Sequence, residues 1–219
     1  MYKGYKTVVF DLDGTLLDTL QDLYVAVNAA LTEYALPTRT KEEVRAFVGN
    51  GVAKLMQRAI GEENHPQFHD ILWAFKKYYG AHCKDETKPY AGIMQLLNTL
   101  RSAGIKTAVV SNKTDFAVKL LAEEYFGDLL LDAVGENEEG GVRKKPAPDS
   151  LFSVLKKLNA SKEETVYVGD SEVDIQTAKN AEVDCISVTW GFKDKEFLLA
   201  NGAKILVDTP KEILKYCGL

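Results

Sequence analysis

Three polar stretches of the sequence each follow a short apolar run. They are Asp11-Leu12-Asp13-Gly14-Thr15, Ser111-Asn112-Lys113, and Gly169-Asp170-Ser171 with Asp174 soon after. A single aspartate after a strand is usually a helix cap or a turn residue. Three such stretches at the carboxyl ends of strands in one parallel sheet would instead meet at a single edge, where ligands of open α/β sheets bind. The pattern therefore indicates one shared polar site.

The carboxylates in these stretches suit two chemical tasks. Asp11, Asp170 and Asp174 would crowd negative charge, which is unfavourable unless a cation lies between them. Because they are hard oxygen ligands with no Cys or His nearby, they favour Mg²⁺ over zinc. A carboxylate such as Asp11 can also act as a nucleophile and form an aspartyl-phosphate. Asp13 can then donate a proton to the leaving oxygen and later take one from water.

Other polar residues would complement a phosphoryl group. Ser111 and Asn112 offer hydrogen bonds to its oxygens. Lys145, which directly precedes Pro146, offers a fixed positive charge against the charge of the transferring group. Gly14 would let the chain turn sharply beside the substrate. Together these residues predict phosphoryl transfer at this edge of the sheet.

Alternating apolar runs and helical stretches would position these residues. Several runs are almost continuously apolar, as expected for strands buried on both faces of a parallel sheet. Helical stretches such as 93–103, closed by Gly104, and 115–125 lie between them. This alternation predicts an α/β fold with a doubly wound, Rossmann-like parallel sheet. The expected strands are residues 7–10, 106–110, 129–134, 165–168, 185–189 and 204–207.

One long segment directly after the first strand breaks this alternation. From about residue 20 to residue 83 the pattern is helical, interrupted by one proline and several glycines, and no strand is evident. A helical insert at this point implies a second, smaller domain threaded through the first. We expect residues 18–86 to form an inserted α-helical cap domain, and residues 1–17 and 87–219 to form the α/β core.

Four motifs of the sequence resemble the four ordered motifs of the haloacid dehalogenase superfamily. They are Asp11-Leu12-Asp13-Gly14-Thr15-Leu16, Ser111-Asn112-Lys113, Lys145-Pro146-Ala147-Pro148, and Gly169-Asp170-Ser171-Glu172-Val173-Asp174. The resemblance runs over nearly the whole chain, and the helical insert is similar to the α-helical cap of that superfamily. Within the superfamily, the sequence looks most like the phosphoglycolate phosphatase group. An aspartate at the position of Asp13 favours phosphate esters over the dehalogenase and phosphonate reactions of other members.

This resemblance implies a role for each motif residue. Asp11 would be the nucleophile and Asp13 the general acid and base. Ser111 and Asn112 would hold the phosphoryl group together with Lys145. The expected reaction is therefore the hydrolysis of a phosphomonoester through an aspartyl-phosphate intermediate.

The resemblance also implies a metal site. Mg²⁺ would be held by Asp11, the main-chain carbonyl of Asp13, and Asp170. Asp174 would be an indirect or water-mediated partner of the same ion. Mg²⁺ is thus the one cofactor that we expect.

In the family that the sequence resembles, the cap faces the active site and helps to choose the substrate. The polar cap residues Arg45, Asn50 and Lys54 are therefore candidates for contacting the leaving group. The alternative for each of them is a solvated position on the helix surface. Which of the two holds depends on how the cap sits over the core.

Several other functions would use the same core. A β-phosphoglucomutase-like phosphomutase would return the phosphoryl group to the substrate, and a pyrophosphatase or nucleotidase would share the motifs. A catalytically silent binding protein would be expected to have lost Asp11, Asp13, Lys145 or Asp170, and all four are present. The histidine seen near the first cap helix of some sugar phosphomutases is absent from residues 19–23. We therefore predict a hydrolase that acts on a small phosphorylated metabolite, with phosphoglycolate as the first guess.

Composition sets the remaining expectations. The chain has 219 residues and a formal net charge of −5. An acidic balance argues against nucleic-acid binding, which needs a basic face. No segment approaches the roughly 20 apolar residues of a membrane helix, and the N-terminus does not resemble a signal peptide. The three cysteines match no metal-binding spacing. We expect a cytoplasmic enzyme without membrane or nucleic-acid partners.

Overall fold

A six-stranded sheet forms the centre of the protein. This computed structural model describes residues 4–137 and 140–219. The strands of the central sheet are β1 (Thr7–Phe10), β4 (Lys106–Thr114), β5 (Asp132–Glu136), β6 (Thr165–Gly169), β7 (Asp184–Val188) and β8 (Ile205–Val207). They lie in the order β5-β4-β1-β6-β7-β8, and every adjacent pair is parallel. The chain builds outward on one side of β1 and then returns to the other side, so the topological switch point lies at β1.

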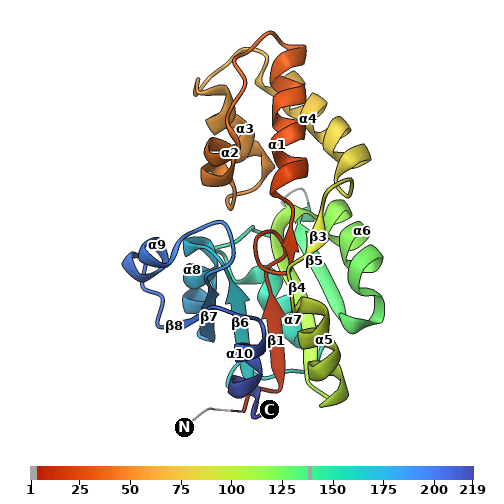
Figure 1. The fold of residues 1–219 in the computed structure, drawn as a ribbon, viewed down its shortest axis with the longest axis vertical. Helices are drawn as coiled ribbons and strands as arrows, with labels where there is room; N and C mark the ends of the chain where they lie inside the picture. Colours follow the sequence, from red (N-terminus) through yellow and green to blue (C-terminus); the bar gives the residue numbers. More distant parts are fainter. Residues whose placement is uncertain (1–3, 138–139) are drawn as a thin grey trace.

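Helices cover both faces of this sheet (Figure 1). In β1, Val8 and Phe10 belong to the larger hydrophobic core, whereas Val9 belongs to a second, smaller core. This alternation follows from the two-residue period of a strand, and it buries both faces of β1. The fold is therefore the α/β doubly wound arrangement that the sequence predicts. The larger core includes residues of α5 (Ile93–Ser102), α6 (Asp115–Phe126) and α10 (Lys211–Leu214), and the smaller core includes residues of α7 (Asp149–Lys157) and α8 (Glu172–Ala181).

Four further helices lie beyond the carboxyl ends of the strands (Figure 1). They are α1 (Leu20–Glu33), α2 (Lys41–Phe47), α3 (Val52–Ile60) and α4 (Phe68–His82). The buried side of α1 includes Leu23, Val27 and Leu31, which recur at helical spacing. Thr40 and Glu43 begin α2 with a capping box, in which each side chain bonds the other residue's backbone N–H. These helices place an apolar layer, continuous with the larger hydrophobic core, over the edge of the sheet where the motif residues end.

A short pair of strands connects this helical segment to the sheet. β2 (Leu17–Asp18) and β3 (Lys88–Pro89) pair antiparallel, with Leu17 opposite Pro89 and Asp18 opposite Lys88. The outgoing and returning chain segments therefore lie side by side. The sequence does not predict these strands, because two residues are too few to show a period. The expected boundaries after residues 17 and 86 fall at this pair, and the division into two domains stays a prediction.

Two of the expected strands differ from the observed ones by more than one residue at an end. The strand expected at residues 129–134 begins only at Asp132, because residues Gly127–Leu129 form a 3-10 turn, η1, after α6. The strand expected at residues 106–110 continues to Thr114, with an irregular register between Val110 and Thr114. Both differences arise at the ends of apolar runs, where pairing with a neighbouring strand decides the boundary. The remaining elements are α9 (Lys195–Ala200) and a C-terminal 3-10 turn, η3 (Lys215–Cys217).

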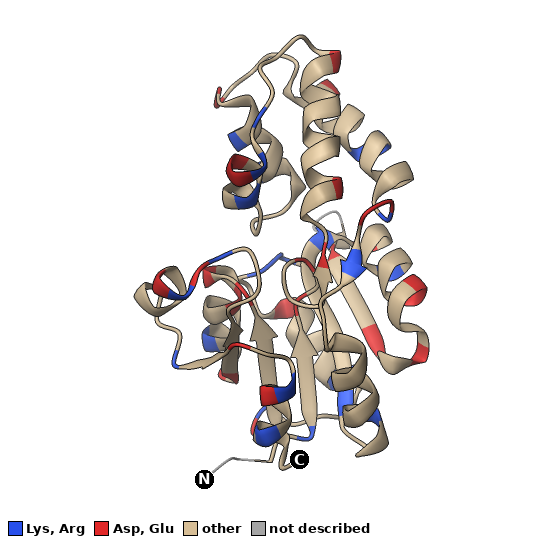
Figure 2. Cartoon of the chain, viewed as in Figure 1, with Lys and Arg blue, Asp and Glu red and all other residues tan. Residues whose placement is uncertain are grey.

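Charged residues of both signs are distributed over the helices and the loops (Figure 2). Acidic and basic side chains occur together on α2, where Lys41 and Arg45 flank Glu42 and Glu43. Among the described residues, no helix is both long enough and apolar enough to cross a membrane.

Candidate active site

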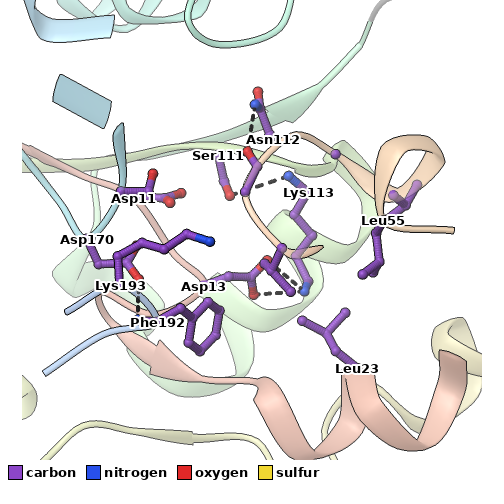
Figure 3. A pocket seen from close by; sticks show the side chains of 15 residues that line it. Asp11, Asp13, Leu23, Leu55, Ser111, Asn112, Lys113, Asp170, Phe192 and Lys193 are labelled. Atoms are coloured by element: carbon purple, nitrogen blue, oxygen red, sulfur yellow. Dashed lines mark hydrogen bonds and ion pairs between the residues drawn. The ribbon is translucent and has the colours of Figure 1, made fainter. Parts of the chain in front are cut away.

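The polar motifs meet at the carboxyl ends of β1, β4 and β6. Asp11 directly follows β1, and Asp170 directly follows β6. The two strands are adjacent and in register, and Asp11 N donates to Val168 O at 2.8 Å. Ser111 lies on β4, in the stretch of irregular register that redirects side chains from the regular pleat. Asp11, Asp13, Ser111 and Asp170 all line one pocket, which Figure 3 shows.

Asp11 is a buried carboxylate with a close counter-charge. Its side chain is 12% exposed, and its Oδ1 lies 3.0 Å from Lys145 Nζ. The same oxygen accepts a hydrogen bond from Leu12 N at 2.7 Å. Burial raises the pKa of Asp11 to about 6, even though the charge of Lys145 opposes the rise. These contacts fix the orientation of the carboxylate that the sequence names as the nucleophile.

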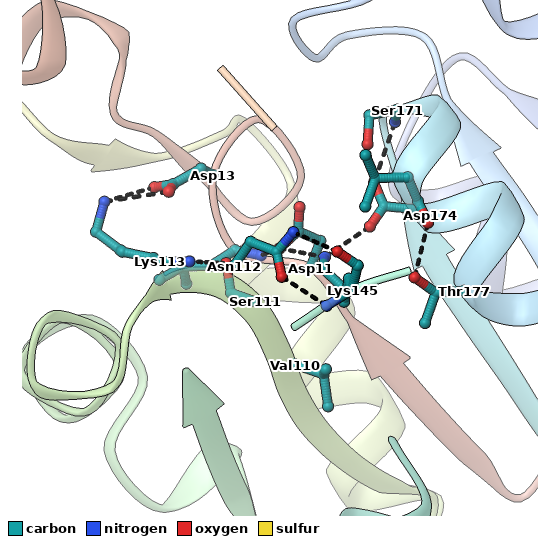
Figure 4. A network of polar contacts seen from close by, with 12 residues as sticks. Asp11, Asp13, Val110, Ser111, Asn112, Lys113, Lys145, Ser171, Asp174 and Thr177 are labelled. Atoms are coloured by element: carbon teal, nitrogen blue, oxygen red, sulfur yellow. Dashed lines mark hydrogen bonds and ion pairs between the residues drawn. The ribbon is translucent and has the colours of Figure 1, made fainter. Parts of the chain in front are cut away.

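Lys145 links Asp11 to Asp174 (Figure 4). Its Nζ lies 2.7 Å from Asp174 Oδ1, and it donates to the hydroxyl of Tyr167 at 3.0 Å. The other oxygen of Asp174 accepts from both N and Oγ of Ser171, at 3.1 and 2.6 Å. Burial lowers the pKa of Lys145, but Asp11 and Asp174 outweigh this effect and hold the pKa well above its usual value. The ammonium is therefore charged and held between two carboxylates.

Asp11, Asp170 and Asp174 form a cluster that fits a divalent cation. Each offers a carboxylate oxygen, and these oxygens lie within 4.8 Å of one another. The pKa of Asp170 lies well above its usual value. Burial is the largest cause, and the negative charges of nearby Asp174 and Asp11 raise the pKa further. With Lys145 as the one ammonium between them, three ionised carboxylates would keep a net charge of about −2, which a divalent ion would balance. An all-oxygen donor set of this kind suits Mg²⁺.

Two glycines allow the chain to approach Asp170 closely. A Cβ on Gly14 would lie 2.3 Å from Asp170 Oδ2, and Gly14 has a φ of +80°. A Cβ on Gly191 would lie equally close, at 2.3 Å from Asp170 Cβ. Phe192 N then donates to Asp170 Oδ2 at 2.6 Å. The turn that the sequence assigns to Gly14 is thus needed for packing against a proposed metal ligand.

The side chain of Asn112 bonds the main chain on two sides of the pocket. Its Oδ1 accepts from Lys145 N at 2.8 Å, and its Nδ2 donates to Lys145 O at 3.0 Å. Nδ2 also donates to Gly49 O at 3.1 Å. Asn112 therefore positions the segment that carries Lys145. Its predicted contact with a phosphoryl group, like that of Ser111, stays a prediction.

Asp13 and Lys113 line the same pocket, and their side chains are in contact. Lys113 Nζ is 2.9 Å from Asp13 Oδ1 and 3.1 Å from Oδ2, and it also donates to the hydroxyl of Tyr79 on α4 at 2.5 Å. Burial lowers the pKa of Lys113, but Asp13 and Tyr79 outweigh this and raise it above its usual value. From the sequence alone, Lys113 has no assigned role. Its place directly after Ser111 and Asn112 is a signal that it lies at the same site as they do.

Comparison with known families decides how this site is classified. The sequence model of the haloacid dehalogenase-like hydrolases matches residues 8–188, which include all four motifs. The chain belongs to this family. The match spans the sheet strands β1 to β7 and the helical insert, so it covers both parts of the molecule.

Individual relatives within the family are also similar over most of their length. A phosphoglycolate phosphatase of Pseudomonas syringae pv. syringae is 33% identical over 219 residues, which cover 97% of this chain and 79% of the relative. One from Chromobacterium violaceum is 33% identical, with 96% of each chain covered. A crystal structure from Lactobacillus delbrueckii subsp. bulgaricus, assigned as a phosphoglycolate phosphatase, superposes with a TM-score of 0.92 at 37% identity, covering 97% and 98% of the two chains. This chain is therefore a phosphatase of the haloacid dehalogenase type.

The helical segment of this phosphatase contributes to the pocket mainly with apolar residues and glycines. Arg45 and Asn50, which the sequence names for substrate contact, are not among the described residues that line it. Arg45 instead donates from Nη2 to Gly191 O at 2.8 Å, and Lys54 donates to Gln57. Arg45 is therefore held by a core loop, and the expected substrate contacts stay predictions. The pocket residues from the helical segment are Leu23, Val48, Gly49, Gly51, Val52 and Leu55.

Besides Lys113, sequence reasoning missed a second cationic pocket residue of the core. Lys193 lines the pocket, and its Nζ donates to Ala46 O at 3.0 Å. Burial lowers the pKa of Lys193. The residue follows Phe192 in the loop after β7, where no motif marks it. Its position beside Asp170 is visible only in three dimensions (Figure 3).

Proposed function

We propose that this phosphatase hydrolyses a small phosphomonoester through an aspartyl-phosphate on Asp11, with Mg²⁺ as cofactor. One observation carries the proposal. The buried carboxylate of Asp11 lies 3.0 Å from Lys145 Nζ and belongs to a cluster of three carboxylates at the topological switch point of the sheet. This arrangement supports a nucleophile, a phosphoryl-binding cation and an oxygen-ligand metal site at the place where ligands of such sheets bind.

In the first step, an oxygen of Asp11 attacks phosphorus and the bond from phosphorus to the leaving oxygen breaks. Asp13 gives its proton to that oxygen, so the product leaves as an alcohol. In the second step, water attacks phosphorus and gives its proton to Asp13, and the bond from phosphorus to Asp11 breaks. Inorganic phosphate leaves, Asp11 is again a free carboxylate, and Asp13 again carries a proton in place of the one that it gave up in the first step.

The surrounding residues would support both steps by holding charge in place. Lys145 faces Asp11 and would stabilise the charge of the transferring phosphoryl group. Asp11, Asp170 and the main-chain carbonyl of Asp13 would hold Mg²⁺, which supplies further charge stabilisation when bound. Both oxygens of Asp174 are engaged by Lys145 and Ser171, which fits an indirect part in the metal site.

The substrate we propose is a small phosphorylated acid, with phosphoglycolate as the first candidate. The named relatives are phosphoglycolate phosphatases. Lys193 adds positive charge to the pocket, and Leu23 and Leu55 line it with apolar surface. We also propose that residues 18–86 act as a cap domain, which would exclude water until the substrate is bound. A phosphomutase, pyrophosphatase or nucleotidase has no particular observation in its favour.

A phosphate-release assay tests this proposal. With Mg²⁺, the purified protein should release phosphate from a panel of phosphorylated metabolites and favour small acids. Chelation should abolish release, and added Mg²⁺ should restore it. Asp11→Asn should lower kcat at least roughly a thousandfold, because an amide cannot form the covalent intermediate. The matched control is Asp128→Asn, at a side chain that is 82% exposed, and it should retain activity. Normal turnover by folded Asp11→Asn, or in excess chelator, would contradict the proposal.

A further inference from the structure

The proposed reaction leaves one buried cation without a function. The side chain of Lys113 is only 2% exposed, yet its ammonium carries three N–H donors. Three acceptors surround it: Oδ1 and Oδ2 of Asp13 at 2.9 and 3.1 Å, and the hydroxyl of Tyr79 at 2.5 Å. Each donor therefore has one acceptor. A buried ammonium needs such a complete set, since an unpaired N–H in the interior is costly.

The three residues come from three separate parts of the chain. Asp13 follows β1, Lys113 lies on β4, and Tyr79 lies on α4 in the helical insert. The ring of Tyr79 is 4% exposed and stacks on Phe75 of the same helix, with centroids 5.5 Å apart and planes 7° from parallel. The hydroxyl position is thus set by the packing of the insert. The contact of Lys113 with Asp13 connects two core elements, and its contact with Tyr79 connects the core with the insert.

We propose that Lys113 is a positioning residue for Asp13, and that Tyr79 makes this positioning depend on the helical insert being packed against the core. The inference rests on the proposed function, in which Asp13 transfers a proton in both steps. Both oxygens of Asp13 contact Lys113, so the ammonium sets the direction of the carboxylate. With α4 in place, Tyr79 supplies the third acceptor and restrains the ammonium. Without that hydroxyl, the ammonium has an unmatched donor and can rotate away, and Asp13 loses its fixed direction.

This role predicts a kinetic signature that general damage to the site does not share. With p-nitrophenyl phosphate, nitrophenolate leaves without needing a proton, so phosphorylation of Asp11 does not depend on the position of Asp13. The attack of water still needs Asp13 to take a proton. Misplacing Asp13 should therefore slow the second step alone, and phosphate should accumulate on the protein during turnover. A general loss of site structure would slow both steps.

The test compares Tyr79→Phe with Tyr78→Phe in the full-length protein with Mg²⁺. Both variants remove one hydroxyl from α4, but the hydroxyl that accepts from Lys113 belongs to Tyr79, whereas the ring of Tyr78 stacks on His82 with ring centroids 4.4 Å apart. Acid-quenched protein-bound phosphate is measured during turnover of p-nitrophenyl phosphate, alongside kcat for an alkyl phosphate. Tyr79→Phe should lower kcat roughly tenfold, as loss of a hydrogen bond to a charged group does, and should raise the phosphorylated fraction. Tyr78→Phe should match the wild type.

A second variant, Lys113→Met, tests the same role in case Tyr79→Phe does not fold. It should show the same accumulation with a larger loss of kcat, and circular dichroism and urea unfolding check that both variants are folded. The inference is overturned if Tyr79→Phe has wild-type kcat, or if kcat falls with no rise in bound phosphate. Turnover without any protein-bound phosphate in the wild type or the variants, combined with an active Asp11→Asn, would instead overturn the proposed function and this inference with it.

Discussion

Asp11 combines a buried position with a proposed chemical task that needs its charge. Burial raises the pKa of its carboxyl to about 6, whereas the ordinary value is 3.8. Asp170 is raised as well, because it is also buried and lies near Asp174 and Asp11. The folded protein therefore binds protons on these groups more tightly than the unfolded chain does. The proposed nucleophilic attack requires the ionised form of Asp11, and keeping that form buried costs the folded protein stability.

This leads to a prediction for stability against pH in the absence of metal. For a carboxyl whose pKa is raised on folding, the free energy of unfolding falls as pH rises from the unfolded value toward and through the folded value. Between about pH 4 and pH 6, the ionisation of Asp11 alone should lower the free energy of unfolding by up to about 3 kcal/mol. Mg²⁺ should offset this loss, so its stabilising effect should be greater at pH 7.5 than at pH 5. Urea unfolding with chelator and with Mg²⁺ measures both.

Asp11→Asn gives the control for this prediction. The amide carries no charge, so the metal-free variant should be more stable than the wild type above pH 6 and should depend less on pH. The direction in which the stability of each protein changes with pH tests the prediction. If metal-free wild-type protein gained stability from pH 5 to pH 7.5, or if metal-free Asp11→Asn were less stable than the wild type at pH 7.5, the burial of ionised Asp11 would not be costly as inferred.

At the scale of elements, Asp22 fastens the start of α1 to the returning chain. This carboxylate is 6% exposed and lies in the first turn of α1. It accepts hydrogen bonds from Glu86 N at 3.0 and 3.2 Å, from Thr87 N at 2.9 Å and from Thr87 Oγ1 at 2.7 Å. Tyr125 of α6 in turn donates to Thr87 O at 2.8 Å. Both segments that connect the insert with the sheet are therefore tied to each other and to the core.

Asp22→Ala should destabilise the protein by about 2–4 kcal/mol, because it leaves the buried N–H and hydroxyl of Thr87 without this acceptor. Asp70→Ala is the matched control: Asp70 lies in the first turn of α4 but is exposed, so it tests the helix dipole alone. Its loss should stay below about 1 kcal/mol. Urea unfolding measures both values. Equal losses for the two variants would show that the contacts of Asp22 with residues 86–87 contribute little.

At the scale of the whole molecule, the arrangement of the core and the insert bears on whether the protein acts as a hydrolase or as a mutase. Both use the same carboxylates, so the choice depends on what reaches the aspartyl-phosphate after the leaving group departs. A mutase needs polar side chains aimed inward to retain a sugar. The helical insert lines the pocket with Leu23, Val48, Val52, Leu55 and two glycines. This lining offers no hydroxyl or amide side chain to a sugar, and it favours attack by water.

We therefore expect turnover in oxygen-18 water to place one labelled oxygen in each released phosphate. Water attacks phosphorus in the second step, and the leaving alcohol keeps its own unlabelled oxygen. Mass spectrometry of phosphate and alcohol measures the label. A small phosphorylated acid and a sugar 1-phosphate should be compared under the same conditions. Conversion of the sugar 1-phosphate to its 6-phosphate with little free phosphate would contradict the hydrolase assignment, and label in the alcohol would contradict attack at phosphorus.

Much of this fold and of the motif positions could be read along the chain. The strand at Thr7–Phe10 appears where expected, and the absence of strands from 20 to 83 holds among the described residues. These features depend on local periodicity and on apolar runs, which neighbouring residues encode. The gathering of Asp11, Asp170 and Asp174 also follows from sequence, because parallel strands end at one edge of a sheet.

Other features were decided only by the tertiary structure. Tyr79 meets Lys113 across 34 residues, and Arg45 meets Gly191 across 146. β2 and β3 form because two distant dipeptides lie side by side. Each contact depends on how the helical insert sits on the core, which no local pattern encodes. The sequence by itself thus predicted which residues would carry the chemistry, and it determined which edge of the sheet they share. Only packing between distant segments decided which side chains hold them in place, because side-chain direction and partner are set by long-range contacts.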